Sequence, residues 1–135
     1  MSDALQILPE AWTWSFLLIV LVVVFHAFGL VLIYDVAEKL QDSIGDHRFR
    51  ILFATVTSTT VLLITMLHII EGAAWALAYV LLGALPNTRS SLLFSLNAIT
   101  SYGHVNLDLQ PHWQVMGALE ALNGVMLFGL TTAFL

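Results

Sequence analysis

Three long apolar runs constrain this chain more than any other feature of its sequence. The runs cover residues 11–34, 51–85 and 111–135. The first holds His26 as its only ionisable residue, the second holds Glu71 as its only charge, and the third contains Glu120. About 20 apolar residues in a helix cross the roughly 30 Å hydrocarbon core of a bilayer, so each run is long enough to span it. We therefore expect an all-α membrane protein with three transmembrane helices.

Composition supports this class and excludes several others. Of 135 residues, 59% are hydrophobic and 10% are charged, whereas an average soluble domain has about 25% charged residues. Four Lys and Arg face nine Asp and Glu, a balance that disfavours a nucleic-acid partner. The chain has no Cys, which excludes disulfides and Cys-ligated metal centres. We expect neither an enzyme nor a resident cofactor or metal.

The basic residues predict the topology. Three of the four, Lys39, Arg48 and Arg50, lie in the polar segment 35–50, which we expect to be a cytoplasmic loop because positive charge concentrates on that side. The N-terminus is then outside and the C-terminus cytoplasmic, in a multi-pass protein of the plasma or inner membrane. As one helix the second run would be about 50 Å long, so it must tilt or extend past the lipid. Near its outer end, Trp75 and Tyr79 are expected at the interface.

A short segment between the second and third runs has the pattern of a re-entrant hairpin. Asn87 or Thr88 can cap a helix of about ten residues, which is too short to cross the bilayer. The segment begins and ends on the outer side, and its apolar residues, such as Phe94, favour insertion. Non-helical backbone at membrane depth must be buried in protein or line a cavity, so the segment predicts a pore or binding site. The alternative is an outer loop in which Tyr102-Gly103 is an ordinary turn.

In this order of elements the chain resembles the pore module of the tetrameric potassium-channel superfamily: outer helix, pore helix, filter loop and inner helix. The resemblance is closest to small bacterial members with one additional N-terminal helix. It is carried by Leu82-Gly83-Ala84-Leu85-Pro86, Phe94-Ser95-Leu96, Tyr102-Gly103, Trp113 and Leu119-Glu120-Ala121-Leu122-Asn123-Gly124. It divides the chain into an N-terminal helix and loop (1–50) and a pore domain (51–135), with outer helix 51–85, pore helix 88–98, filter 99–104 and inner helix 111–135.

The resemblance implies a passive cation channel, with potassium as the favoured ion and sodium as the second. Four copies would surround one axis, and their partners would be one another and membrane lipids. Filter carbonyls aimed at the axis would replace the hydration shell of the ion. The implied ion-coordinating residues are Ile99, Thr100, Ser101, Tyr102 and Gly103, with His104 at the outer mouth, Glu120 and Asn97 as filter support, and Gly124 and Gly129 as points where the inner helix bends.

The filter departs from the family's Thr-Val-Gly-Tyr-Gly-Asp. Alignment without gaps places Ile99 at the Thr, Ser101 at the first Gly and His104 at the Asp. An alternative alignment keeps Thr100 as the filter Thr and deletes one residue. A left-handed Ser101 would cost roughly 1–2 kcal/mol. Protonation of His104 would place positive charge at the mouth and lower cation current as the pH falls through about 6.5.

Ionisable residues inside the apolar runs need partners, because an unpaired charge in lipid is costly. His68 and Glu71 are three residues apart and share a helix face, so we expect a hydrogen-bonded pair, with a proton relay as the alternative. We expect His26 to bond to the second helix. Glu120 should hydrogen-bond to Ser95, Asn97 or a neighbouring hydroxyl, or else be protonated and simply packed.

Depth counting argues against a haem between His26 and His68. Counted from Tyr34 and Ile51, the two histidines differ in depth by about 13 Å at 1.5 Å per residue.

Two other functions remain open. One is a non-conducting channel homologue that acts as a sensor or assembly partner. The other is a proton-coupled transporter that uses His68, Glu71 and Glu120.

Overall fold

The computed structural model describes residues 2–44, 49–103 and 108–135, and helices dominate these ranges. The elements are α1 (Ser2–Ile44), α2 (Phe49–Leu81), α3 (Thr88–Ile99), the 3-10 turn η2 (Pro111–Trp113) and α4 (Gln114–Phe134). Three stretches are long and apolar enough to cross a membrane: Glu10–Ser43, Phe49–Leu81 and Pro111–Phe134. The predicted all-α fold with three membrane-length helices is confirmed.

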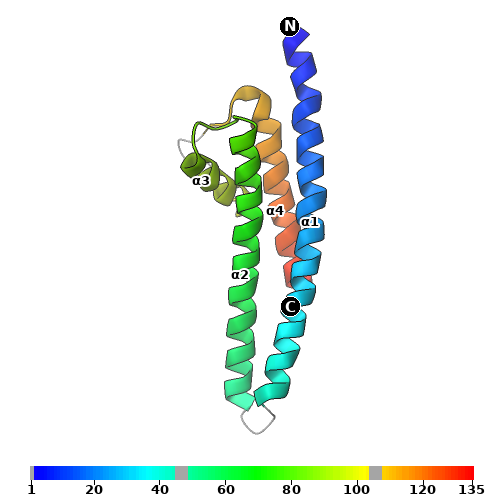
Figure 1. Ribbon diagram of the computed structural model, residues 1–135, viewed down its shortest axis with the longest axis vertical. Coiled ribbons are helices and arrows are strands. Elements are labelled where there is room, and N and C mark those ends of the chain that lie inside the picture. The colour runs from blue at the N-terminus through cyan, green and yellow to red at the C-terminus, as the bar shows by residue number, and fades with distance from the viewer. Residues whose placement is uncertain (1, 45–48, 104–107) are drawn as a thin grey trace.

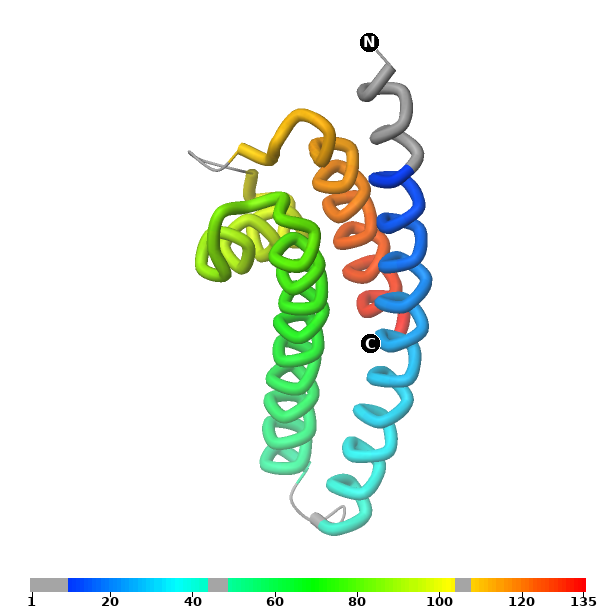
Figure 2. Tube along the Cα trace, turned by 45° about the horizontal axis from the view of Figure 1, so that its top comes forward, coloured from blue at the N-terminus to red at the C-terminus, as the bar shows by residue number. Residues whose placement is uncertain are grey.

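The helices form an elongated bundle with the short helix at one end. Helices α1 and α2 run antiparallel, and α4 lies beside α1 over part of its length (Figure 1). Helix α3 packs against α2 and α4, on the side of the bundle away from α1. A second view shows α3 beside the C-terminal end of α2, with the start of α4 nearby (Figure 2).

The polar segment 35–50, predicted as a loop, is helical as far as Ile44. Its residues 36–41 read Val-Ala-Glu-Lys-Leu-Gln, and most of these are good helix formers, so the helix continues after the apolar run ends. Helices α1 and α2 therefore extend well past the end of α4 (Figure 1). From the level of His26 and Thr131, which are in contact, α1 continues for 18 residues and α4 for only three. The difference corresponds to about 22 Å.

Trp75 and Tyr79 are fully buried, so the expectation of an interfacial position for them is wrong. They lie on the same face of α2 as His68, Glu71 and Gly72, which are also buried. This face is covered by α1 and α3, and the Tyr79 ring meets Phe94 of α3 edge to face at 5.3 Å. The aromatic pair is therefore part of the core that attaches α3 to the bundle.

Local sequence determines both ends of α3. The Asn87 side chain accepts a hydrogen bond from the Ser90 N–H at 2.8 Å, so Asn87 is the N-cap. At the other end Ser101 is left-handed, with φ of 55°. The Ser101 N–H donates to the Ala98 carbonyl and the Tyr102 N–H to the Asn97 carbonyl, which is the pattern of a Schellman motif. The helix thus stops abruptly, with Ile99 as its last residue.

The C-terminal end of α3 packs directly on the backbone of α4. A Cβ atom at Gly124 would lie 2.2 Å from the Ile99 carbonyl oxygen, so only glycine permits this approach. On the α2 side, the Ser95 hydroxyl lies 2.6 Å from the Gly72 carbonyl oxygen. Gly124 is ten residues into α4, and Gly72 is nine residues from the end of α2. Both contacts place the C-terminal part of α3 about 14–15 Å along the bundle from the end of α2 and from the start of α4.

Gly124→Ala should destabilise the protein by about 1–3 kcal/mol or more, because a new methyl group would collide with backbone that cannot rotate away. Gly129→Ala is the matched control on the same helix, since a Cβ atom there meets nothing within 4 Å. It should be neutral or stabilising by up to about 1 kcal/mol. Equilibrium unfolding in mixed detergent micelles measures both changes, and equal effects of the two substitutions would contradict the close contact.

Candidate functional site

The predicted filter segment begins inside α3 and continues onto the surface of the single chain. Thr100, Ser101, Tyr102 and Gly103 are exposed, and Tyr102 has 78% of its surface accessible. Ile99 differs from them, because it is buried and its carbonyl oxygen lies against Gly124. No described residue donates a hydrogen bond to the carbonyls of residues 100–103. His104 lies outside the described residues.

Glu120 is the centre of a buried polar cluster, which we call the Glu120 cluster, with Tyr79 of α2 and Ser95 of α3. The Tyr79 hydroxyl donates to Oε2 of Glu120 at 2.7 Å. The Ser95 hydroxyl is hydrogen-bonded to Oε1 of Glu120, as expected from the sequence. All three side chains are fully or almost fully inaccessible. The cluster therefore connects α2, α3 and α4 immediately behind the predicted filter segment.

Counting protons in the Glu120 cluster indicates a neutral carboxyl group. The Ser95 hydroxyl has one proton but two oxygens within hydrogen-bond distance, Glu120 Oε1 and the Gly72 carbonyl. A carbonyl oxygen can only accept, so both contacts are hydrogen bonds only if Ser95 donates to Gly72 and accepts a proton from Glu120. The expected hydrogen bond to Ser95 is present, so Glu120 is not simply packed. The protonated carboxyl group of the alternative agrees with this geometry.

Sequence reasoning missed one polar side chain beside this cluster and misplaced two. Tyr79 and Trp75, both expected at the interface, are buried. Asn123, one turn from Glu120, is fully buried, and both polar atoms of its side chain lack a partner among the described residues. Trp75 Nε1 is in the same situation. The predicted support residue Asn97 is half-buried, and its backbone carbonyl accepts hydrogen bonds from the Tyr102 N–H and the Thr100 hydroxyl. The spacing of Glu120 and Asn123 on one face of α4 was the available signal.

A second buried cluster, which we call the histidine ring, joins α1, α2 and α4. Nδ1 of His26 lies 2.7 Å from Oε1 of Glu71, and Nδ1 of His68 lies 3.0 Å from Oε2 of the same carboxyl group. Oγ1 of Thr131 lies 3.2 Å from Nε2 of His26 and 3.3 Å from Nε2 of His68. Phe128 stacks on the His68 ring at 4.4 Å. The expected His68–Glu71 pair within α2 and the expected bond from His26 to α2 are both present, whereas Thr131 was not anticipated.

The depth argument for the two histidines is wrong, because their ring centroids are 5.4 Å apart. Helix α1 continues to Ile44 and α2 begins at Phe49, so the correct counts are 18 and 19 residues and the depths match. The rings are nevertheless too close to enclose a haem. Ligand-type atoms of His26, His68 and Glu71 lie within 4.8 Å of one another. A divalent ion with one carboxylate would leave a net positive charge in an apolar interior, which is costly. The closed set of hydrogen bonds fits these atoms better.

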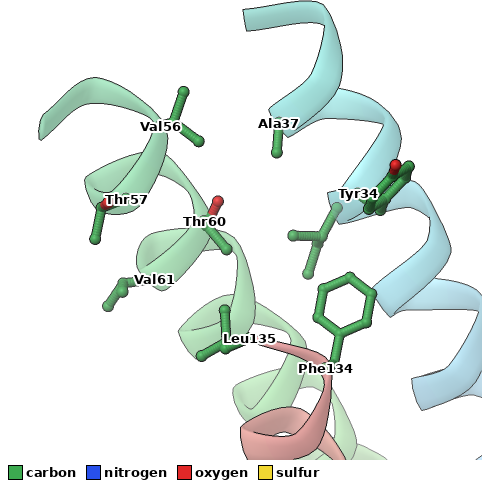
Figure 3. A pocket seen from close by; sticks show the side chains of 9 residues that line it. Tyr34, Ala37, Val56, Thr57, Thr60, Val61, Phe134 and Leu135 are labelled. Atoms are coloured by element: carbon green, nitrogen blue, oxygen red, sulfur yellow. The ribbon is translucent and has the colours of Figure 1, made fainter. Parts of the chain in front are cut away.

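An open groove of about 470 Å³ lies past the end of α4, between the extended parts of α1 and α2 (Figure 3). Phe134 and Leu135 reach into it from α4, and the remaining lining side chains are mainly apolar. Its hydroxyl groups come from Tyr34, Thr57 and Thr60. They do not form a charged or ligating cluster, so the groove is not the candidate site.

Comparison with known proteins gives no match: no family model, no curated protein and no solved structure matches the chain.

Glu120→Gln should change the unfolding free energy by less than about 0.5 kcal/mol, because an amide can accept from Tyr79 and donate to Ser95 as the neutral carboxyl group does. Glu120→Met is the matched control of similar size. It should cost about 1–3 kcal/mol, since it leaves buried hydroxyl groups without partners. Equilibrium unfolding in micelles separates the two variants. If Gln were as damaging as Met, the cluster would need an ionised carboxylate and the proton count would be wrong.

Proposed function

We propose that the chain is one subunit of a passive cation channel in which four copies surround a shared pore. The observation that carries this proposal is the position of the end of α3, halfway along α4. Gly72 and Gly124, which contact Ser95 and Ile99, lie about 14–15 Å from the neighbouring helix ends. In a hydrocarbon core of about 30 Å this depth is close to the bilayer midplane.

The chain must return from this depth to the start of α4. Residues 100–103 leave α3 without helical structure, and Pro111 begins the turn before α4. Non-helical backbone inside a bilayer persists only when it is buried in protein or lines a watery cavity. The exposure of residues 100–103 in a single chain means that other copies of the chain or water must cover them. A pore between subunits satisfies this requirement.

The chemistry of the segment suits a cation. The carbonyl oxygens of residues 100–103 accept no hydrogen bond from a described residue, so they are available as ligands. The C-terminal end of α3 adds the partial negative charge of its helix dipole at the same place. One chain contributes one such strand, and rotational symmetry around the pore axis would supply the others. A neutral Glu120 supports α3 from behind without adding a fixed charge to the ion path.

The position of Ile99 favours the second of the two filter alignments. Its carbonyl oxygen is occupied by the contact with Gly124, whereas Thr100 is the first exposed residue after α3. In this alignment Thr100 takes the place of the filter threonine, and the ligands are the carbonyls of residues 100–103. Potassium remains the favoured ion by resemblance, with sodium as the second.

A non-conducting channel homologue is the second candidate, and one observation favours it. The turn after α3 is closed by its own backbone, since the N–H groups of Ser101 and Tyr102 both donate into the helix. A segment fixed in this way can serve as structure in a sensor or assembly partner. The proton-coupled transporter is weaker, because Glu120 and Thr131 are eleven residues apart. This spacing separates the Glu120 cluster from the histidine ring by about 16 Å along α4.

Purified protein in planar bilayers under opposed potassium and sodium gradients tests the proposal. We expect a current that reverses near the potassium equilibrium potential. Gly103→Ala should abolish it, because φ at Gly103 is 91° and a side chain disfavours this conformation. Gly83→Ala is the matched control, since Gly83 also has positive φ, at 65°, and also has no neighbour within 4 Å of its Cβ position.

The outcomes distinguish the candidates. Loss of current in both glycine variants would indicate general damage to the fold and not a role of the filter. No current from folded wild-type protein under any gradient would contradict the channel and support the non-conducting homologue. A reversal potential that follows the proton gradient would support the transporter.

A further inference from the structure

The histidine ring contains four hydrogen-bond contacts and needs a proton for each. The contacts join Glu71 to His26 and to His68, and join Thr131 to the same two histidines. Each neutral histidine carries one ring N–H and the threonine carries one O–H, which gives three protons. An ionised Glu71 carries none. Two neutral imidazoles, one threonine hydroxyl and one carboxylate therefore hold three protons for four contacts. One additional proton is required to complete the ring.

We propose that His26, Glu71, His68 and Thr131 form a binding site for one proton that fastens α1 to α2 and α4. With this proton bound, one histidine donates from both ring nitrogens, and the other donates to Glu71 and accepts from Thr131. The proton can equally reside on Glu71, which reverses one hydrogen bond and leaves all four intact. In either arrangement the carboxyl group and the two imidazoles have a net charge of zero.

Neutrality is what makes the site suitable for its surroundings. His26 and Glu71 are fully inaccessible and His68 is 8% exposed, so the site is cut off from the solvation that would stabilise a net charge. Removal of the proton leaves a net negative charge and one contact without a donor. Addition of a second proton makes both histidines cationic and leaves a net positive charge. Only with one bound proton does the ring have a donor for every contact and no net charge.

No other titratable side chain of the packed helices reaches the ring. On α1 the next described titratable residue is Tyr34, eight residues from His26, and on α2 it is Tyr79, eight residues from Glu71. On α4, Glu120 is eleven residues from Thr131. These separations are about 12–16 Å along the helices. The described part of α3 contributes only Arg89, which is exposed. The described titratable groups outside the ring are therefore too far from it to share its hydrogen bonds.

The bound proton has a definite consequence for stability. In the unfolded chain, histidine titrates near 6.5 and glutamate near 4.3. Above about pH 7.5 the unfolded ring residues hold no extra proton, while the folded ring holds one. Unfolding then releases one proton, so the unfolding constant rises tenfold for each pH unit. Between about pH 4.5 and 6 the unfolded histidines hold two protons, and the unfolding constant rises tenfold per unit as the pH falls.

Glu71→Gln is the informative variant because it completes the ring without the extra proton. The amide oxygen accepts from one histidine and the amide N–H donates to the other, so all four contacts are kept. The folded variant then holds one proton fewer than the folded wild type. In the unfolded state the two chains differ only by an ionised Glu71, which holds no proton above about pH 5. Above about pH 5, the folded wild type therefore holds one proton more than the folded variant, and the two unfolded chains hold the same number.

The experiment is equilibrium unfolding of wild type and Glu71→Gln in mixed micelles between about pH 6 and pH 8. The ratio of their unfolding constants, wild type over variant, should rise tenfold per pH unit, because the contributions of all other groups cancel. Asp35→Asn removes an exposed carboxylate from α1 and should give a ratio that does not change with pH. A constant ratio for Glu71→Gln would overturn the proposal, as would a hundredfold change per unit.

A second measurement keeps the proposal testable if the variant does not fold. Nitrogen-15 spectra of the histidine side chains in wild-type protein report the protonation of His26 and His68 directly. We expect no titration of either ring between about pH 6 and pH 8, whereas histidines in the unfolded protein titrate near 6.5. Titration of either ring histidine near 6.5 in the folded protein would overturn the proposal. So would a metal ion bound stoichiometrically to the purified chain, because it would replace the proton.

Discussion

Polar groups in the apolar interior of this bundle must find their partners within the protein, and the rest of the structure depends on this constraint. Unpaired polar groups are costly in lipid because no water can replace a missing partner. The Glu120 cluster and the histidine ring meet the constraint in a similar way, with one carboxyl group between two partners, of which at least one lies on another helix. Each cluster joins three helices, and proton counting makes both neutral.

The two clusters have different positions relative to the short helix. The Glu120 cluster connects α3 to α2 and α4, so it determines where the end of α3 lies. The histidine ring lies farther along α4 and connects α1 to the same pair of helices. Gly124 completes the arrangement by allowing the Ile99 carbonyl to approach the α4 backbone. The proposed filter would need a rigid frame of this kind, because its carbonyl oxygens would have to keep a fixed geometry.

Patterns that depend on neighbouring residues could be predicted from the sequence, and those that depend on tertiary contacts could not. Run lengths predicted the three long helices, and Asn87 predicted the start of α3. Segment 35–50 was predicted as a loop because its polarity changes at Asp35, although its residues favour a helix. The depth of His26 was counted from this boundary and not from the true end of α1, so the two histidines were placed at different depths. Thr131 and Tyr79 could not be assigned partners, because nothing local indicates which residue of a distant helix faces them.

The end of α3 at half the depth of α4 is the central claim, and the absence of Cys from the chain makes it directly measurable with spin labels. Labels at Thr100 and Gly129 form one pair, and labels at Arg89 and Gly129 form the other; all three positions are exposed. Labelled chains diluted with unlabelled ones in lipid give the distances within one chain by pulsed electron resonance. A distance that is clearly shorter for Thr100 is expected. Equal distances would show that α3 lies across the end of the bundle, and would contradict the proposed pore.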